Sequence, residues 1–264
     1  MGVFKDNSLS RNAITAPGLA ISLAIALSAC STNGSTPIGA NDPINTASIG
    51  QASIKSTYAA RKAWLADQKD LRKGMAYARH LQSLEQNNEQ LSVLEQLIKH
   101  NPSNTKLLVF YGKRLISNGR SKEAVGILKQ AESRGERDWR LYSALGSALA
   151  QTGRNREARV YYNKALKLNP TEVKIQNNLA MSYTLEGKYA NAEKILRAAN
   201  NTPTGRAMPR IRQNLALVVG LQGRFSEARQ IASRDLPKAQ VDANMAFLQK
   251  MLSKDNTWSK LKKS

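Results

Sequence analysis

The sequence predicts an all-α fold, an α-solenoid in which short helical hairpins repeat along the chain. Three observations lead to this prediction. A six-residue phrase that begins with glycine and ends with alanine recurs at a nearly constant spacing. The apolar residues between these phrases follow a helical period. Only 6% of the 264 residues are aromatic. One hairpin cannot bury its apolar face alone, so we expect the hairpins to stack into a right-handed superhelix with a concave side.

Composition limits the chemistry open to the chain. It contains 40 Lys and Arg against 19 Asp and Glu, a formal net charge of +21. One cysteine and two histidines, His80 and His100, cannot supply a disulfide framework or a four-ligand Cys/His zinc site. The sequence also lacks a phosphate-binding loop and a Gly-x-Ser-x-Gly elbow. We therefore predict a binding protein, not an enzyme, with no metal, no cofactor and no small-molecule substrate.

Residues 1–29 have the features of an export signal. Lys5 and Arg11 precede an uncharged run over residues 13–29, which contains Pro17 and Gly18. This run is shorter than the ~20 apolar residues that a transmembrane helix needs. A basic flank before a short apolar run is typical of a secretory signal peptide, which is how we interpret this segment.

The end of this signal resembles the bacterial lipobox. Its residues are Leu27-Ser28-Ala29-Cys30, and Cys30 is the only cysteine of the chain. The resemblance implies that the chain is cut before Cys30 and that Cys30 is acylated, which would anchor the protein to a membrane. Because Ser31 and not Asp follows Cys30, the resemblance implies the bacterial outer membrane, with the protein facing the periplasm.

A flexible tether is predicted after the signal, over residues 30–56. This stretch is rich in Ser, Thr, Asn, Gly and Pro and shows no helical period. A helical pattern begins near Thr57, and we assign the helical domain to residues 57–252. Residues 253–264 form a basic tail.

The helical domain repeats one phrase four times. The phrases are Gly119-Arg-Ser-Lys-Glu-Ala124, Gly153-Arg-Asn-Arg-Glu-Ala158, Gly187-Lys-Tyr-Ala-Asn-Ala192 and Gly223-Arg-Phe-Ser-Glu-Ala228. Their glycines are 34, 34 and 36 residues apart. Upstream of each glycine stands a pair whose second member is small: Gly112, Gly146, Ala180 and Ala216.

This pattern resembles the tetratricopeptide repeat. The best match carries the following residues: Tyr142, Leu145, Gly146, Gly153, Ala158, Tyr162, Ala165 and Pro170. The resemblance implies five repeats near residues 71–104, 105–138, 139–172, 173–206 and 209–240, and residues 241–252 predict a terminal capping helix. The first repeat diverges, because Glu85 stands where the others have glycine.

The chemistry of the repeated positions is packing. Each phrase glycine can adopt positive φ and end the first helix of its hairpin. The small residues let the two helices approach closely, and a bulky side chain there would overpack by ~1–3 kcal/mol. Ser121 and Asn155 are predicted N-caps of second helices.

A column of basic residues marks the candidate binding surface. The second residue of each repeat is basic: Arg72, Lys106, Arg140, Lys174 and Arg210. In this kind of repeat the first helix lines the concave side, so the column predicts a ladder that favours an acidic segment or a C-terminal carboxylate of a protein partner. Asn178 and Asn214, one turn later, could hydrogen-bond an extended peptide. The alternative is a solvated basic flank with no binding role.

The net charge permits three kinds of partner. Nucleic acid is the usual partner of so basic a chain, but export argues against it, and we predict no nucleic-acid binding. Anionic lipid or cell-wall polymer, with help from the basic tail, and an acidic protein stay open.

The last repeat and the helix after it carry a narrower resemblance. The phrases are Arg212-Gln-Asn-Leu-Ala216 and Asn244-Met-Ala-Phe-Leu248. With the lipobox, they resemble the tetratricopeptide-repeat lipoprotein of the tight-adherence (Flp) pilus assembly system. That resemblance implies a pilotin or scaffold that helps a secretin reach the outer membrane or multimerise. Two alternatives are a lipoprotein of outer-membrane protein insertion and an activator of cell-wall synthesis.

Overall fold

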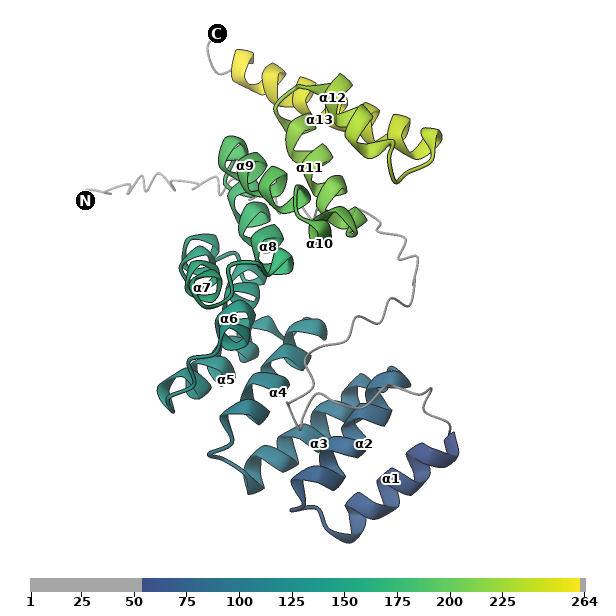
Figure 1. Cartoon of the computed structure of the whole chain (residues 1–264), viewed down its shortest axis with the longest axis vertical. Helices are drawn as coiled ribbons and strands as arrows, with labels where there is room; N and C mark the ends of the chain where they lie inside the picture. The colour runs from purple at the N-terminus through teal and green to yellow at the C-terminus, as the bar shows by residue number, and fades with distance from the viewer. Residues whose placement is uncertain (1–53, 262–264) are drawn as a thin grey trace, which may run out of the picture. The chain divides into compact units, whose positions relative to one another are not determined.

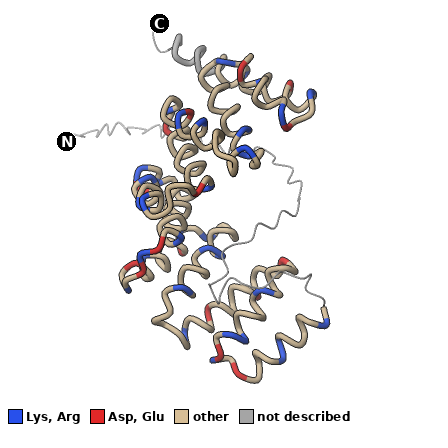
Figure 2. The backbone as a smooth tube through the Cα atoms, viewed as in Figure 1, with Lys and Arg blue, Asp and Glu red and all other residues tan. Residues whose placement is uncertain are grey.

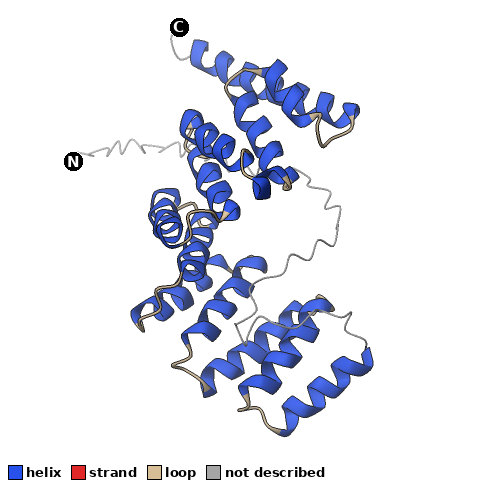
Figure 3. Cartoon of the chain, in the orientation of Figure 1, coloured by secondary structure: helices blue, strands red, loops and turns tan. Residues whose placement is uncertain are grey.

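The computed structural model describes residues 54–261, with side chains described as far as residue 253. Every regular element in this part of the chain is a helix (Figure 3). The predicted signal over residues 1–29, Cys30 and the tether up to residue 53 lie outside the described residues. None of the described helices combines the length and the apolar character needed to cross a bilayer.

Five helical hairpins follow one another, as Figure 1 shows. The first helices of the hairpins are α2 (Leu71–Ser83), α4 (Thr105–Ser117), α6 (Trp139–Gln151), α8 (Val173–Thr184) and α11 (Pro209–Leu221). The second helices are α3 (Asn87–His100), α5 (Ser121–Ser133), α7 (Asn155–Leu168), α9 (Tyr189–Asn200) and α12 (Phe225–Ala232). Helix α1 (Ile54–Ala66) precedes them and α13 (Lys238–Leu261) follows. The predicted all-α array of repeated hairpins is confirmed.

The turn inside each hairpin depends on one residue with positive φ. The four predicted glycines, Gly119, Gly153, Gly187 and Gly223, have φ between +71° and +81°. In the divergent first hairpin Glu85 takes the same place with φ +56°. A side chain makes this left-handed conformation costly, so the first hairpin keeps the geometry of the others under strain.

The two helices of a hairpin begin in different ways. Four first helices have a side-chain cap, because a residue just before each helix accepts a backbone N–H: Asp70, Asn104, Asp138 and Glu172. The second helices have no side-chain cap. The prediction of Ser121 and Asn155 as N-caps is therefore wrong: each is the first helical residue, one position after an arginine.

Small residues in the first helices make close packing possible. A Cβ on Gly112 would lie 2.6 Å from Cδ2 of Leu128 in the second helix of the same hairpin. In the first hairpin, a Cβ on Gly74 would lie 2.5 Å from Cδ2 of Leu97. The predicted role of Gly112 is confirmed, and Ala180 and Ala216 at the equivalent places are buried.

A short helix explains the irregular spacing of the last repeat. Helix α10 (Pro203–Arg206) stands between α9 and α11, and the Thr202 hydroxyl caps it by accepting the Gly205 N–H at 2.9 Å. A Cβ on Gly205 would clash with the backbone oxygen of Ala199, so the chain turns tightly here. The two residues beyond the usual 34 lie in this segment.

Both ends of the array differ from the predicted boundaries. Helix α1 starts at Ile54, so the last three residues assigned to the tether are helical. Helix α13 starts at Lys238 and continues to Leu261, through most of the predicted tail. Val241, Met245 and Leu248 pack this helix onto the last hairpin, as expected of a cap.

Candidate functional site

Four of the five first helices form a continuous inner row. Helix α4 contacts α6, α6 contacts α8, and α8 contacts α11. Each second helix instead packs against the first helix of the next hairpin, as α5 does against α6 and α7 against α8. Since the first helices are the more closely spaced set, they make the inner surface of the array, as the sequence analysis expects. We call this surface the first-helix row.

Polar side chains connect neighbouring helices of the first-helix row. Asn178 on α8 donates from Nδ2 to the Ser147 hydroxyl on α6 at 3.5 Å. Asn214 on α11 donates from Nδ2 to Oδ1 of Asn177 on α8 at 2.6 Å. Both predicted asparagines therefore lie in this row. Each amide uses only part of its hydrogen-bonding capacity in these lateral bonds, so peptide groups of a partner could use the rest.

The basic column occupies one equivalent position in every first helix. Its members are the second residues of α2, α4, α6, α8 and α11: Arg72, Lys106, Arg140, Lys174 and Arg210. All except Arg140 are exposed, and those four form no ion pair with another described residue. The guanidinium of Arg140 instead donates to Asp138 at 3.0 Å and lies over the Trp139 ring at 4.7 Å. Four members of the column are thus available to a partner.

The charge of the first helices has one sign only. The chain has 19 acidic residues, yet α2, α4, α6, α8 and α11 contain no Asp or Glu. Figure 2 shows the acidic positions of the described chain in the second helices, the turns and the ends of the array. The basic residues of the five first helices are Arg72, Lys73, Arg79, Lys106, Lys113, Arg114, Arg140, Lys174, Arg210 and Arg212.

Helix stability does not account for this pattern. A cation in the first turn of a helix faces the positive end of the helix dipole, which is unfavourable by a few tenths of a kcal/mol or more. The column places Lys106, Lys174 and Arg210 in that first turn. Carboxylates there would stabilise the helices, but they occur only as caps before the helix. The basic column therefore points to a role outside the helices that carry it.

Acidic residues of the second helices and turns serve to join neighbouring hairpins. Glu193 on α9 pairs with Arg224 at the start of α12 at 2.8 Å and accepts from Gln222 at 2.7 Å. Burial would raise the pKa of Glu193, but hydrogen bonds from Gln222, Arg224 and Arg197 outweigh it and lower the pKa to about 2. Arg159 on α7 likewise donates to Glu186 in the α8–α9 turn at 2.8 Å.

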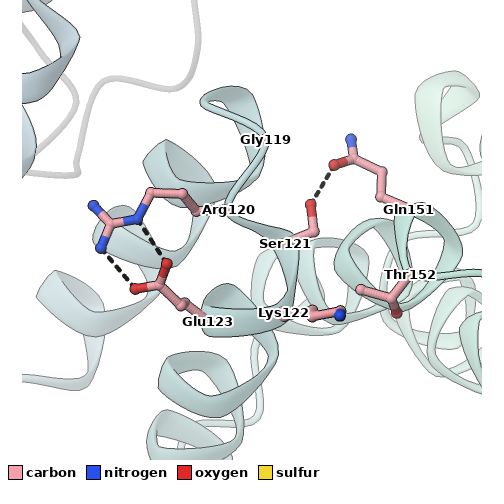
Figure 4. A pocket seen from close by; sticks show the side chains of 7 residues that line it. All are labelled: Gly119, Arg120, Ser121, Lys122, Glu123, Gln151 and Thr152. Carbon is pink, nitrogen blue, oxygen red and sulfur yellow. Dashed lines mark hydrogen bonds and ion pairs between the residues drawn. The ribbon is translucent and has the colours of Figure 1, made fainter.

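Two hollows on the surface repeat with the period of the array. The larger, of about 410 Å³, is lined by residues 119–123, Gln151 and Thr152 (Figure 4). Its polar groups pair with one another: Arg120 donates to Glu123 through two nitrogens, and the Ser121 hydroxyl donates to Gln151. A similar hollow over residues 153–157 follows one hairpin later. We conclude that both are products of the hairpin turns.

No catalytic or metal-binding unit stands out in the described part of the chain. Among its residues no group of three His, Cys, Asp or Glu side chains could hold a metal ion. His80 lies in the last turn of α2 and His100 at the end of α3, in separate helices of the first hairpin. The first-helix row is therefore the strongest candidate for a functional surface.

One property of this row escaped the sequence analysis. The basic column drew attention to one position in each repeat, whereas the whole of each first helix lacks acidic residues. Lys113 and Arg79, two further turns along α4 and α2, were missed for the same reason. The absence of acidic residues can be read from the sequence only after the helix bounds are known, because first helices and second helices must be compared separately.

Comparisons with known proteins agree with the helix pairs. Two sequence models of the tetratricopeptide repeat match the chain, over residues 139–172 and 161–194. The chain has no significant match among curated protein sequences. The matched residues span the third hairpin and most of the fourth.

Solved structures extend the similarity over most of the helical part. YrrB, described as a TPR protein with an unusual peptide-binding site, aligns with a TM-score of 0.55 and 18% identity over 74% of this chain and 99% of its own. TTC0263 of Thermus thermophilus, a thermophilic TPR protein, aligns with a TM-score of 0.54 and 21% identity over 67% of this chain and 98% of its own. A tetratricopeptide repeat protein of Parabacteroides merdae aligns with a TM-score of 0.57 and 14% identity over 74% of this chain and 77% of its own. The tetratricopeptide-repeat models thus match residues 139–194, and the solved structures show that the helical part shares the fold of such repeat proteins.

Proposed function

We propose that this protein is a scaffold without catalytic activity, whose first-helix row binds an extended, acidic segment of a protein partner. Proteins with tetratricopeptide repeats bind protein or peptide partners, which supports the general role. The observation that carries the specific proposal is the absence of Asp and Glu from all five first helices of a chain that has 19 such residues. Helices whose own charged residues are all positive attract acidic segments, while the carboxylates of Asp70, Asp138 and Glu172 stay engaged as caps before three of them.

The polar residues of the row suit an extended segment. Asn178 and Asn214 lie on neighbouring first helices and can offer amide groups to a peptide backbone. The exposed lysines and arginines of the column recur once in each repeat and would pair with carboxylates spaced along the segment. One relative, YrrB, is described as having a peptide-binding site, which is consistent with such a use of the fold.

Charge reversal with a matched control tests this proposal. We would replace two exposed column residues, Lys106→Glu and Lys174→Glu, and measure binding of a labelled Asp/Glu-rich peptide by fluorescence anisotropy. The control changes two exposed lysines of second helices, Lys122→Glu and Lys194→Glu, and so has the same net charge. We expect at least a tenfold loss of affinity in the first variant and a small change in the second. Equal losses in both would show that only net charge matters and would refute a binding row.

The attachment and the cellular role complete the proposal. The lipobox resemblance supports acylation of Cys30 and attachment to the outer membrane, on the periplasmic side. A Cys30→Ser variant is then expected in the soluble fraction after cell lysis, while the unchanged chain sediments with membranes. Sedimentation of the variant with membranes would contradict the anchor.

The resemblance of the last repeat to the tight-adherence pilus lipoprotein supports a role as pilotin or scaffold for a secretin. In-cell crosslinking followed by identification of the captured protein tests this role directly. Capture of a pilus secretin, together with loss of secretin multimers on deletion, would support it. Capture of an outer-membrane barrel insertase, or binding to isolated peptidoglycan, would favour one of the two alternative envelope roles.

A further inference from the structure

Helix α1 carries an uncovered apolar stripe. Ile54, Tyr58 and Leu65 follow one another at helical spacing, and their exposed fractions are 84%, 66% and 47%. They belong to the few large apolar residues that the described part of the chain leaves exposed. Such a stripe on one face of a helix indicates a contact with something outside the array.

A neighbouring side of α1 is fixed to the array. Trp64 is 5% exposed and stacks on Tyr77 of α2, with ring centroids 5.7 Å apart. Helix α2 is the principal partner of α1 in the described structure, so α1 forms the end of the stack (Figure 1). The stripe is therefore held outward by a rigid attachment.

The charged residues of α1 itself are all positive. Lys55 and Lys62 are exposed and lie beside it, and α1 contains no Asp or Glu. Arg61 lies between the stripe residues, seven positions after Ile54 and four before Leu65, with its Nε 3.9 Å from Glu89 of α3. An apolar stripe with lysines alongside is typical of helices that lie in the interface of an anionic bilayer, where apolar side chains enter the headgroup boundary and lysines contact lipid phosphates.

We propose that α1 docks on the surface of an anionic lipid bilayer. This inference rests on the proposed lipid attachment, because only 23 residues lie between Cys30 and Ile54. A tether of the predicted composition spans roughly 27 Å. The acylated cysteine and α1 would thus reach the same membrane surface, and α1 would orient the array on it.

A second copy of the chain fits this face less well. In a two-fold symmetric contact the same face meets itself, so Lys55 and Lys62 of both copies would come together. With no acidic residue in α1, nothing in the helix would compensate that repulsion.

The test uses residues 48–264, which form one compact unit that contains every described helix, together with vesicles. This part lacks Cys30, so any binding comes from the folded unit. Cosedimentation is measured with vesicles of phosphatidylcholine alone and of phosphatidylcholine with phosphatidylglycerol. We expect binding to the anionic vesicles only, weakened by salt.

Matched variants assign that binding to α1. The first changes the stripe, Ile54→Ser, Tyr58→Ser and Leu65→Ser, and its control changes three exposed apolar residues elsewhere, Val160→Ser, Leu168→Ser and Leu185→Ser. We expect the stripe variant to lose at least tenfold in vesicle affinity and the control to bind like the unchanged unit. A second variant, Lys55→Gln with Lys62→Gln, should lose about fivefold for each lysine. Its control is Lys122→Gln with Lys194→Gln.

The remaining outcomes overturn the inference. Equal losses in variants and controls, or binding to neutral vesicles as strong as to anionic ones, would exclude a specific role of α1. A dimer in sedimentation velocity that only the stripe variant dissolves, without vesicle binding, would assign the stripe to self-association. Circular dichroism checks that each variant keeps its helix content. If the stripe variant loses helix content, the lysine variant alone tests the role of α1 in vesicle binding. Binding of the acidic peptide is measured in parallel, so that failure here is separate from failure of the first-helix row.

Discussion

The ring of Tyr162 on α7 fills the space that a side chain at position 146 of α6 would need. A Cβ on Gly146 would lie 2.5 Å from Cε1 of this ring. The tyrosine is almost fully buried, and its hydroxyl donates to Ser147 at 3.4 Å. The small residue of the repeat is thus half of a pair, whose other half is a large side chain from the second helix.

Adding one methyl group at this contact should therefore be costly. We expect Gly146→Ala to lower the free energy of unfolding by about 1–3 kcal/mol, because Tyr162 or the helix backbone must move. Gly126→Ala on α5 is the control, since no atom lies within 4 Å of its added Cβ. That variant should gain about 0.5–1 kcal/mol from helix propensity. Urea unfolding measures both, and a stable Gly146→Ala variant would show that the contact is adaptable.

The strained turn of the first hairpin offers a stabilising substitution. Glu85 has φ +56°, where the other four hairpins have glycine. We expect Glu85→Gly to raise the free energy of unfolding by about 0.5–1 kcal/mol, since relief of the strain exceeds the entropy that glycine loses on folding. The reverse change, Gly119→Ala, should cost about 1 kcal/mol although its Cβ meets no atom. A destabilised Glu85→Gly variant would mean that the side chain has another role in the turn.

Acid should weaken the joint between the fourth and fifth hairpins. The pKa of Glu193 lies at about 2 in the folded chain, below its ordinary value of 4.5. The contribution of Glu193 to the free energy of unfolding is fully present above pH 4.5. It disappears as the pH falls towards 2, because the Glu193 carboxylate binds a proton more readily in the unfolded chain than in the folded one. The side chain is 12% exposed, so this contribution should be on the order of 2 kcal/mol.

Unfolding of the Glu193→Gln variant measures that contribution. The variant should be less stable than the unchanged chain at pH 6 and should approach it as the pH falls to 2. Glu157→Gln is the control, because Glu157 also has a lowered pKa through its hydrogen bonds with Arg154 but is largely exposed. We expect a much smaller pH effect there, and equal pH effects in both variants would contradict the assignment to Glu193.

An ion pair with little exposure holds the last turn of the array. Arg212 on α11 donates from Nε to Asp235 at 2.7 Å, and the two side chains are 14% and 9% exposed. Asp235→Asn leaves the guanidinium without its counter-charge, so we expect a loss of about 3 kcal/mol in the free energy of unfolding. Asp242→Asn, in an exposed pair with Arg229, should change stability little. Similar losses of unfolding free energy in both variants would show that solvent exposure does not determine how much these ion pairs stabilise the fold.

Much of the fold could be predicted because its determinants are local. The positive φ of Gly153 and the close approach at Gly146 follow from the chemistry of glycine and from a fixed period. Glu85 departs from the pattern in sequence but not in conformation, because packing of the first hairpin overrides the preference of one residue. The N-caps were misassigned because Ser121, although a good capping residue, lies one position inside its helix.

The candidate site could be predicted only in part. The second position of each repeat follows directly from the period, so the placement of Lys106 and Lys174 could be found without a structure. The pairing of Arg140 with Asp138 depends on side-chain geometry at the start of α6, which no repeat pattern encodes. The bond between Asn214 and Asn177 joins residues 37 apart and depends on how α10 sets the last hairpin.

Because the first helices contain no acidic residue, positive charge is less compensated on the inner side of the array than in the second helices. An approaching acidic chain would be turned towards the inner side before any atom touches, since the field acts over about a Debye length. Added salt should therefore lower the association rate constant far more than it raises the dissociation rate constant. The same partner would bind quickly at low ionic strength and slowly at high ionic strength.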